Sequence, residues 1–336
     1  MRALIWLQFF ACLAAILFAG TRLAKYADVI AEKSKLGRIW IGLALVAMIT
    51  AMPEMATGIS AATLVDSPDL AMGTLIGSCC FNLALIAVLD IANRKRPVLA
   101  GMSSRHLPGV RWGFLLLLIA GATLFLAPRL PTMMLGWISL GSLLLMAAYV
   151  YAIRRILRGE RKEEPPEPGS VSHYGSMTLR GALVRFLGAA TLVVGAGIWL
   201  SLVGDQIAVV TGWGSSFVGN LLLAAATSAP ELVVCVSAVR MGFRDIAIAD
   251  ILGANMLDTG MLGLVDAIYS RGSLFAGASQ VNLAVVICAA LMVATTGIAI
   301  RRGTATYLFW RVSWYGPILI GLYVAAAYIL FAFGTA

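Results

Sequence analysis

The sequence predicts an all-α polytopic membrane protein, and three observations carry that prediction. Hydrophobic residues make up 60% of the 336-residue chain and charged residues only 12%, about half the charged share usual in soluble domains. Apolar runs of the length needed to cross a bilayer, about 20 residues, recur along the whole chain. The Lys and Arg residues gather in alternate segments between those runs.

The apolar runs give ten predicted transmembrane helices, five on each side of a polar segment. In order, they cover residues 3–20, 37–64, 69–90, 112–128, 133–153, 182–203, 211–239, 246–268, 280–300 and 313–333. The first run follows Arg2 and could be mistaken for a signal peptide, but it is too long and too uniformly apolar for one. Residues 155–181, rich in charge, Pro, Gly and Ser, have the composition of a flexible linker.

The distribution of positive charge predicts the orientation. Of the 25 Lys and Arg residues, all but Arg2, Arg129 and Arg271 fall in one alternating set of inter-helix segments. By the positive-inside rule that set is cytoplasmic, so both termini are predicted to lie outside the cytoplasm. Orientation in the membrane and contact with anionic lipid headgroups therefore account for the net charge of +9. No nucleic-acid partner is expected.

The two sets of five helices carry the same motifs. Residues 50–62 (TAMPEMATGISAA) align with 227–239 (TSAPELVVCVSAV) at an offset of 177. Residues 69–82 (DLAMGTLIGSCCFN) align with 245–258 (DIAIADILGANMLD) at an offset of 176. With five helices per copy, the second copy enters the membrane from the opposite face, as in many secondary transporters. The predicted organisation is a first five-helix repeat (1–154, motifs within 50–82), a cytoplasmic linker (155–181) and a second, inverted repeat (182–336, motifs within 227–258).

A Pro-Glu pair lies in the middle of a membrane span in each repeat. Pro53 and Pro230 lack an N–H, so each breaks its helix and frees a carbonyl one turn earlier, and in hydrocarbon that carbonyl needs another partner. Glu54 and Glu231 follow directly, and an acid buried in a membrane helix indicates function by default. Two carboxylates with backbone and hydroxyl oxygens suit Ca²⁺, which takes about six to eight oxygen ligands. Glu54 and Glu231 are therefore the predicted Ca²⁺ ligands.

The second motif adds further oxygen atoms. Ser78 and Asn82 share one helix face because they are four residues apart, and Asp258 occupies the position equivalent to Asn82. Asp250 lies two turns before Asp258 on the same stripe. These residues are predicted to line the same cation pathway.

Other polar residues are given structural roles. Asp90 and Asp266 end their helices near the cytoplasm, where a solvated or capping role is expected. Ser60 and Ser237 are expected to hydrogen-bond between helices. His106 and His173 fall in cytoplasmic loops and are expected to be solvated. The five cysteines lie in apolar spans without metal-type spacing and are expected to pack as small apolar residues.

At these motifs the chain resembles the Na⁺/Ca²⁺ exchanger family, within the cation/Ca²⁺ antiporter superfamily. That family carries a G/A-T-S-x-P-E and a G-S-N-x-x-N/D motif in each repeat; the equivalents here are ITAMPE with GSCCFN and ATSAPE with GANMLD. The resemblance covers the whole chain and implies a prokaryotic cell-membrane antiporter, without a regulatory Ca²⁺-binding domain, that alternates access by sliding its first and sixth helices. The cation-binding residues that it implies are Thr50, Glu54, Ser78, Asn82, Thr227, Ser228, Glu231 and Asp258, with Thr50 and Thr227 acting through their carbonyls.

Three departures from the family motifs bear on the coupling ion. Ala51 stands where the family has Ser, Cys79 where it has Asn and Ala254 where it has Ser, so two hydroxyls of the Na⁺ sites are missing. Na⁺/Ca²⁺ exchange is the first expectation. The alternative is exchange of H⁺ for Ca²⁺ or another divalent cation, with Asp250 as a possible proton carrier.

Functions of other classes are disfavoured. An intramembrane hydrolase would need a nucleophile–base pair or a metal-type His cluster, which the sequence lacks, and inverted repeats with acids in mid-membrane favour a carrier over a channel. Neither an enzyme nor a pore is therefore expected. The expected partners are inorganic cations (Ca²⁺, with Na⁺ as counter-ion) and the lipid bilayer; no cofactor and no obligate protein partner are expected.

Overall fold

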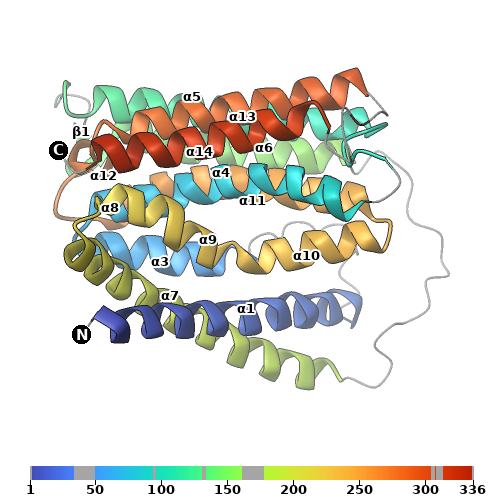
Figure 1. The fold of residues 1–336 in the computed structure, drawn as a ribbon, viewed down its shortest axis with the longest axis horizontal. Helices are drawn as coiled ribbons and strands as arrows, with labels where there is room; N and C mark the ends of the chain where they lie inside the picture. Colours follow the sequence, from blue (N-terminus) through green and yellow to red (C-terminus); the bar gives the residue numbers. More distant parts are fainter. Residues whose placement is uncertain are drawn as a thin grey trace.

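The computed structural model describes residues 2–33, 50–93, 96–130, 134–160, 178–303, 307 and 313–334, and its long helices run side by side (Figure 1). The first half of the chain, up to residue 160, contributes α1 (Arg2–Lys33), α3 (Met52–Thr63), α4 (Pro68–Ala92), the 3₁₀ turn η1 (Ser104–His106), α5 (Leu107–Leu126), strands β1 (Met134–Leu135) and β2 (Ile138–Ser139), and α6 (Leu140–Glu160). The second half, from residue 178, contributes α7 (Leu179–Thr211), α8 (Ser215–Phe217), the π-helical turn η3 (Val218–Leu223), α9 (Ala224–Thr227), α10 (Ala229–Arg240), α11 (Arg244–Ile268), α12 (Leu274–Gly277), α13 (Asn282–Arg302) and α14 (Tyr315–Phe333).

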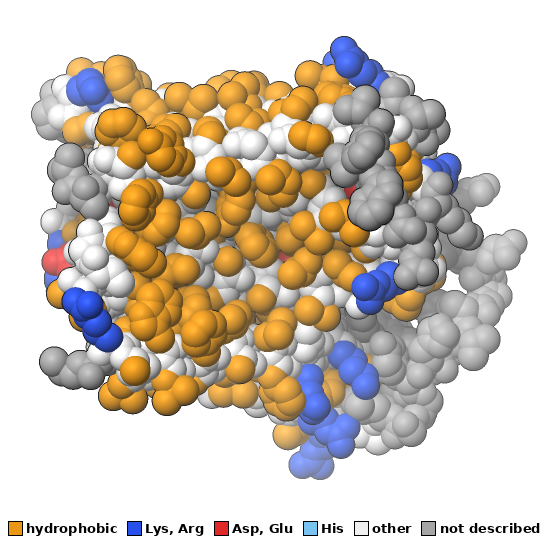
Figure 2. All heavy atoms as spheres, in the orientation of Figure 1, with side chains coloured by type: hydrophobic (Ala, Val, Ile, Leu, Met, Phe, Trp, Pro, Cys, Tyr) orange, Lys and Arg blue, Asp and Glu red, His pale blue; other side chains and the backbone are white. Residues whose placement is uncertain are grey.

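The described helices are those of a multi-pass membrane protein. Eight of them are long and apolar enough to cross a bilayer, and the broken pair Ser215–Thr227 and Ala229–Arg240 makes a ninth. Of the second predicted span, residues 37–49 lie outside the described residues. Figure 2 shows hydrophobic side chains over the middle of one face and Lys and Arg side chains at its two ends, as expected for a protein surrounded by lipid.

Three helices differ in length from the predicted spans. α1 and α7 continue past the apolar runs and reach 32 and 33 residues. Residues 134–139 form a two-stranded hairpin around Gly136, whose φ of 66° favours glycine, so the fifth span begins at Leu140 and not at residue 133. α6 then runs on to Glu160, so the first residues assigned to the linker are helical.

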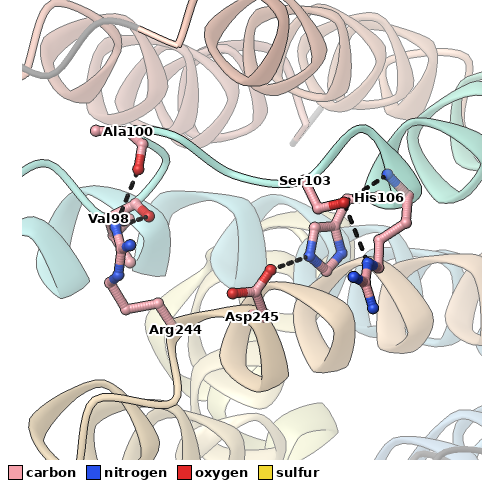
Figure 3. Close-up of polar contacts among 7 residues, drawn as sticks. Val98, Ala100, Ser103, His106, Arg244 and Asp245 are labelled. Atoms are coloured by element: carbon pink, nitrogen blue, oxygen red, sulfur yellow. Dashed lines mark hydrogen bonds and ion pairs between the residues drawn. The ribbon is translucent and has the colours of Figure 1, made fainter.

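The repeat-equivalent helices α4 and α11 lie antiparallel. Just beyond the end of α4, the Val98 carbonyl accepts a 3.2 Å hydrogen bond from the guanidinium of Arg244, which begins α11 (Figure 3). Before the start of α4, Asp66 contacts Tyr269 (2.9 Å) and Arg271 (2.5 Å), just beyond the end of α11. These two partners hold the pKa of the Asp66 carboxyl below its ordinary value, first through the Tyr269 hydrogen bond. α11 and α7 begin at the same end of the molecule (Figure 1). Because α7 is the helix that follows the linker, we call this end the linker end.

Asp90 and Asp266 are buried at opposite ends of the molecule, so a solvated place for both near the cytoplasm is wrong, whereas the alternative, a capping role, agrees with the structure. Asp90 Oδ1 accepts a hydrogen bond from the Val98 N–H at 2.6 Å, and Asp266 Oδ1 accepts one from the Leu274 N–H at 2.6 Å. Val98 and Leu274 are equivalent in the repeat, each eight residues after its acid. The acids are buried because each connecting loop folds back over the end of its helix and supplies hydrogen-bond donors.

Each of these two acids is also hydrogen-bonded to the last helix of the other half. Asp90 Oδ1 accepts a 2.8 Å hydrogen bond from the hydroxyl of Tyr315, which begins α14. Asp266 Oδ2 accepts a 2.5 Å hydrogen bond from the hydroxyl of Ser142, in the first turn of α6. The ends of α4 and α11 are therefore fixed by contacts between the halves.

A second pair of equivalent acids, Asp69 and Asp245, begins α4 and α11. Asp69 Oδ1 accepts a 2.8 Å hydrogen bond from Asn282 Nδ2 at the start of α13, and Asp245 Oδ1 lies 2.9 Å from His106 Nε2 at the start of α5 (Figure 3). Asn282 and His106 are equivalent in the repeat. His106 is only 8% exposed, so the expectation of a solvated histidine is wrong: Asp245 holds it against the bundle. His173 lies outside the described residues.

α1 and α7 pack against each other along one side of the molecule (Figure 1). Two equivalent glycines bring them close to the Pro-Glu segments. A Cβ on Gly20 of α1 would lie 2.6 Å from the ring of Pro230, and one on Gly197 of α7 would lie 3.2 Å from the carbonyl oxygen of Pro53. Each helix thus crosses the Pro-Glu segment of the other half at a point where a side chain would collide.

Candidate cation-binding site

Two helix breaks of the same geometry precede the Pro-Glu pairs. α3 and α10 begin just after Ala51 and Ser228, whose φ/ψ values are −80°/4° and −86°/8°. The proline follows in the first turn of the new helix, where a missing N–H costs no hydrogen bond. At the second break the helix axis bends by 47°. Both breaks place a glutamate, Glu54 or Glu231, in the first turn of the new helix.

The structure buries every residue predicted to bind cations. Glu54 and Ser228 connect the halves directly, because the Ser228 hydroxyl donates a 2.8 Å hydrogen bond to Glu54 Oε1. The Thr227 hydroxyl lies near the same carboxylate. The eight predicted residues, none more than 2% exposed, are Thr50, Glu54, Ser78, Asn82, Thr227, Ser228, Glu231 and Asp258.

Unpartnered polar atoms distinguish this region from the rest of the described interior. Buried polar side-chain atoms are normally hydrogen-bonded, and an exception calls for an explanation such as a bound ion. Three of the four carboxylate oxygens of Glu54 and Glu231 have no hydrogen-bond partner, and neither oxygen of Asp258 has one. Within the part of the chain that the structure describes, all buried side-chain N and O atoms without a partner belong to Glu54, Ser78, Asn82, Asn220, Glu231, Asn255 and Asp258.

The charges in this region are negative, and no ion pair among the described residues compensates them. The carboxylates of Glu54, Glu231 and Asp258 are close enough for their charges to interact, and the ion pairs recorded among the described residues lie elsewhere. No three His, Cys, Asp or Glu side chains among those residues come together at metal-ligand spacing. In this conformation a cation could therefore contact two carboxylates at most, and amide, hydroxyl or carbonyl oxygens would complete its shell.

Sequence reasoning missed two members of the group. Asn255 holds the motif position that Cys79 has in the first repeat, so the motif itself was the signal. Cys79 Sγ lies 3.5 Å from the Asn255 carbonyl oxygen, so these equivalent positions meet between α4 and α11. Asn220 corresponds to an apolar residue, Leu43, in the first repeat, so the repeat comparison does not indicate a functional role for it. Such a role is indicated only by its position on the π-helical turn η3, because π-helical turns are frequent at functional sites. The backbone of Asn220 lies against Gly77, next to Ser78.

Asp250 lies on the side of α11 that contacts α10. It is half-buried between α10 and α11, and its Oδ2 accepts a 3.5 Å contact from the Cys235 thiol. Its charge also interacts with that of Glu231. Asp250 is thus placed on the linker side of Glu231.

Both halves of the chain match one family of transporters. A family model described as "Sodium/calcium exchanger protein" matches residues 4–154 and 181–333. The chain belongs to this family. It is a transporter-family protein and not an enzyme. This exchanger-family chain is 25% identical to "Inner membrane protein YrbG" of Escherichia coli (strain K12) over 325 residues, which cover 91% of this chain and 95% of that protein.

Solved structures share the fold of this exchanger-family protein. The "H+/Ca2+ Exchanger CAX" matches with a TM-score of 0.72 and 17% identity over 98% of this chain and 85% of that one. A structure of the sodium-calcium exchanger NCX_Mj matches with a TM-score of 0.61 and 18% identity over 97% of this chain and 98% of that one. At such identities the likeness extends to the fold alone. That fold accommodates both proteins, so it leaves the coupling ion open.

Proposed function

We propose that this exchanger-family protein is a secondary active cation antiporter that exchanges Ca²⁺ for Na⁺ by alternating access. The observation that carries the proposal is the pair Glu54 and Glu231: two buried carboxylates, one from each half, with three of their four oxygens unpartnered. An uncompensated carboxylate in a low-dielectric interior is costly, and a transported cation offsets that cost.

The proposed architecture is ten helices arranged as two inverted five-helix repeats, 1–154 and 182–336, joined by the linker 155–181. The antiparallel packing of α4 on α11 supports it, as do the matching backbone angles at the two helix breaks. The excess of Lys and Arg makes the linker end cytoplasmic. Both termini then lie outside the cytoplasm, in the cell membrane of a prokaryote.

The proposed site lies near the middle of the membrane, where the two breaks meet. Glu54 and Glu231 bind Ca²⁺ together with the carbonyls of Thr50 and Thr227, which end their half-helices and so present oxygens to a cation. Ser78, Asn82, Ser228 and Asp258 complete this site or neighbouring Na⁺ sites. Sliding of α1 and α7 over the Pro-Glu segments would open the site to one face and then to the other.

Exchange of H⁺ for Ca²⁺ is the second candidate function. It is favoured by Ala51 and Ala254, which remove two hydroxyls from the motif positions associated with Na⁺. Asp250 would then carry the proton. Because the fold is shared with an H⁺/Ca²⁺ exchanger, only a transport measurement separates the two functions.

The deciding experiment is ⁴⁵Ca²⁺ uptake by proteoliposomes under an outward Na⁺ gradient, compared with an imposed pH gradient at equal Na⁺. The control is the Glu54→Gln/Glu231→Gln variant, which keeps the size of both side chains. Na⁺-driven uptake that is lost in this variant is the expected result. Uptake driven only by the pH gradient would show that the counter-ion is H⁺ and not Na⁺. Absence of Ca²⁺ flux under both gradients would contradict the assigned substrate.

Ser228 and its repeat equivalent Ala51 allow a paired test of the hydroxyl that reaches Glu54. Ser228→Ala removes a hydrogen bond to a charged group, worth about 1.5–3 kcal/mol, so we expect the KM for Ca²⁺ to change by about tenfold or more. Ala51→Ser adds a hydroxyl near the other break, where both Glu231 oxygens are unpartnered. We expect this variant to increase the dependence of uptake on Na⁺. Uptake that is insensitive to both changes would argue against hydroxyl ligands at the breaks.

A further inference from the structure

The two repeats differ where the helix after each Pro-Glu break packs against the next long helix, α3 on α4 and α10 on α11. Position 250 is Asp, and its first-repeat equivalent is Thr74, whose hydroxyl donates a 2.7 Å hydrogen bond to the Leu70 carbonyl of its own helix. Position 235 is Cys, and its equivalent is Gly58, where a Cβ would lie 3.3 Å from the side chain of Leu75. The interface of α3 and α4 is thus apolar and filled at this point, whereas that of α10 and α11 carries an acid and a thiol.

The ion pairs formed among the described residues do not include Asp250. Among the described residues its one recorded hydrogen-bond partner is the Cys235 thiol at 3.5 Å, a weak donor. Its charge interacts with that of Glu231, whose two oxygens are both buried and unpartnered. Asp250 lies beside Cys235, which follows Glu231 by one helical turn on α10. Two interacting carboxylates with no ion-pair partner among the described residues repel, so a cation placed between them is strongly favoured.

Asp250 is intermediate in depth between the linker end and the central acids. It follows Arg244 at the start of α11 by six residues, about 9 Å along the helix axis at 1.5 Å per residue. Glu231 precedes Arg240 at the end of α10 by nine residues, about 14 Å. Asp250 is half-buried, whereas Glu231 is 1% exposed. A cation moving from the linker end toward Glu231 would therefore meet Asp250 first.

We propose that Asp250 and Glu231 form a staging site for the transported cation on the linker side, with no counterpart on the opposite side. The inference rests on the proposed antiport through Glu54 and Glu231. Ca²⁺ released from the central site toward the cytoplasm pauses between the two carboxylates, and Ca²⁺ arriving from the cytoplasm is captured there. The staging site makes the apparent affinity for Ca²⁺ higher at the linker face than at the opposite face.

The test is the KM for Ca²⁺, measured separately at each face in oriented proteoliposomes. For Asp250→Asn we expect the KM to rise about tenfold at the linker face, because one member of a close charge pair is lost, and to stay within about twofold at the other face. Asp250→Glu should restore most of the affinity. The control is Glu160→Gln, which removes an acid at the end of α6, the helix that leads into the linker, and should leave both values unchanged.

Three flux results would overturn the proposal. Equal changes at both faces would put Asp250 in the central site, and unchanged KM values would deny it any binding role. A changed dependence on pH with an unchanged KM would make Asp250 a proton carrier.

A second measurement does not depend on transport. In a chain whose other four cysteines are replaced by alanine, the rate at which a small methanethiosulfonate reagent modifies Cys235 is followed with and without Ca²⁺. Ca²⁺ held between Asp250 and Glu231 lies beside this thiol, so it should slow the modification several-fold, and it should have no effect in the Asp250→Asn variant. Protection without Ca²⁺ flux in the unmodified chain would refute the proposed antiport and keep the staging site. Flux without protection would refute the staging site alone.

Discussion

Glu231→Gln is expected to abolish Ca²⁺ uptake and, in cation-free buffer at pH 8, to raise the melting temperature. Both oxygens of Glu231 are buried without a hydrogen-bond partner or a recorded ion pair, and an uncompensated buried charge costs several kcal/mol. Gln occupies the same volume without the charge, so folding becomes more favourable. The same charge is what a cation binds, and its loss should cost about 2–5 kcal/mol of binding, or roughly 30- to 3,000-fold in affinity.

The measurement is thermal unfolding of the purified protein with and without Ca²⁺, beside ⁴⁵Ca²⁺ uptake. Ca²⁺ should stabilise the unmodified chain and leave the Glu231→Gln melting temperature unchanged. In the absence of cations the variant should melt about 3 °C or more above the unmodified chain. The matched control is Glu160→Gln, which changes a glutamate at the end of α6, far from the breaks in sequence. A Glu231→Gln protein that melts lower in cation-free buffer would mean that Glu231 stabilises the fold, in conflict with a ligand role.

Gly77→Ala is expected to destabilise the protein and to disturb the site together. A Cβ at Gly77 would lie 2.5 Å from both the Cα and the carbonyl oxygen of Asn220, and 2.9 Å from the Cβ of Ala224. The first two contacts are with backbone, so η3 as a whole has to move away from α4. Overpacking of this kind costs about 1–3 kcal/mol. Because Asn220 and Ser78 lie at this contact, uptake should fall as well.

Gly195→Ala is the control for this prediction. Gly195 lies within α7, and a Cβ there would meet no atom within 4 Å. Alanine is the better helix former by up to about 1 kcal/mol, so this variant should be as stable as the unmodified chain or more stable. The measurement is the melting temperature of both variants beside their initial rate of uptake. Equal stability of Gly77→Ala and Gly195→Ala would contradict the close contact of α4 with η3.

The membrane class and the family could be predicted from the sequence because both depend on local patterns. Apolar run length is a property of the chain itself, and the matched Pro-Glu pairs fix the register of the repeat. The expectation for Ser60 is also confirmed, since its hydroxyl lies 2.6 Å from that of Ser201, between α3 and α7. Its repeat equivalent Ser237, for which the same bond was expected, is instead exposed. Six of the seven residues with unpartnered buried atoms carry motif positions, and five of these six were predicted from the sequence; the sixth, Asn255, was not.

The remaining features depend on how loops and irregular turns fold. A solvated place was expected for His106, and was one alternative for Asp90, because both lie next to polar loops; only the folded chain brings Val98 and Asp245 onto them. The start of α6 was misplaced because the hairpin before it is nearly as apolar as the helix. Asn220 could not be found by comparing the repeats, because its counterpart is a leucine.

The exchange of contacts between the halves has a consequence for assembly. Asp90 of the first half is completed by Tyr315 of the second, and Asp266 of the second by Ser142 of the first. A half made alone would bury a carboxylate without these donors, so it should be unstable until it meets a half that faces the other way. The halves synthesised as two separate chains should therefore associate. The two halves contact each other as the subunits of a two-fold symmetric dimer would, with one subunit inserted in the opposite orientation. The hydrogen bonds to the buried acids determine which surfaces associate, and the linker only keeps the two halves close together.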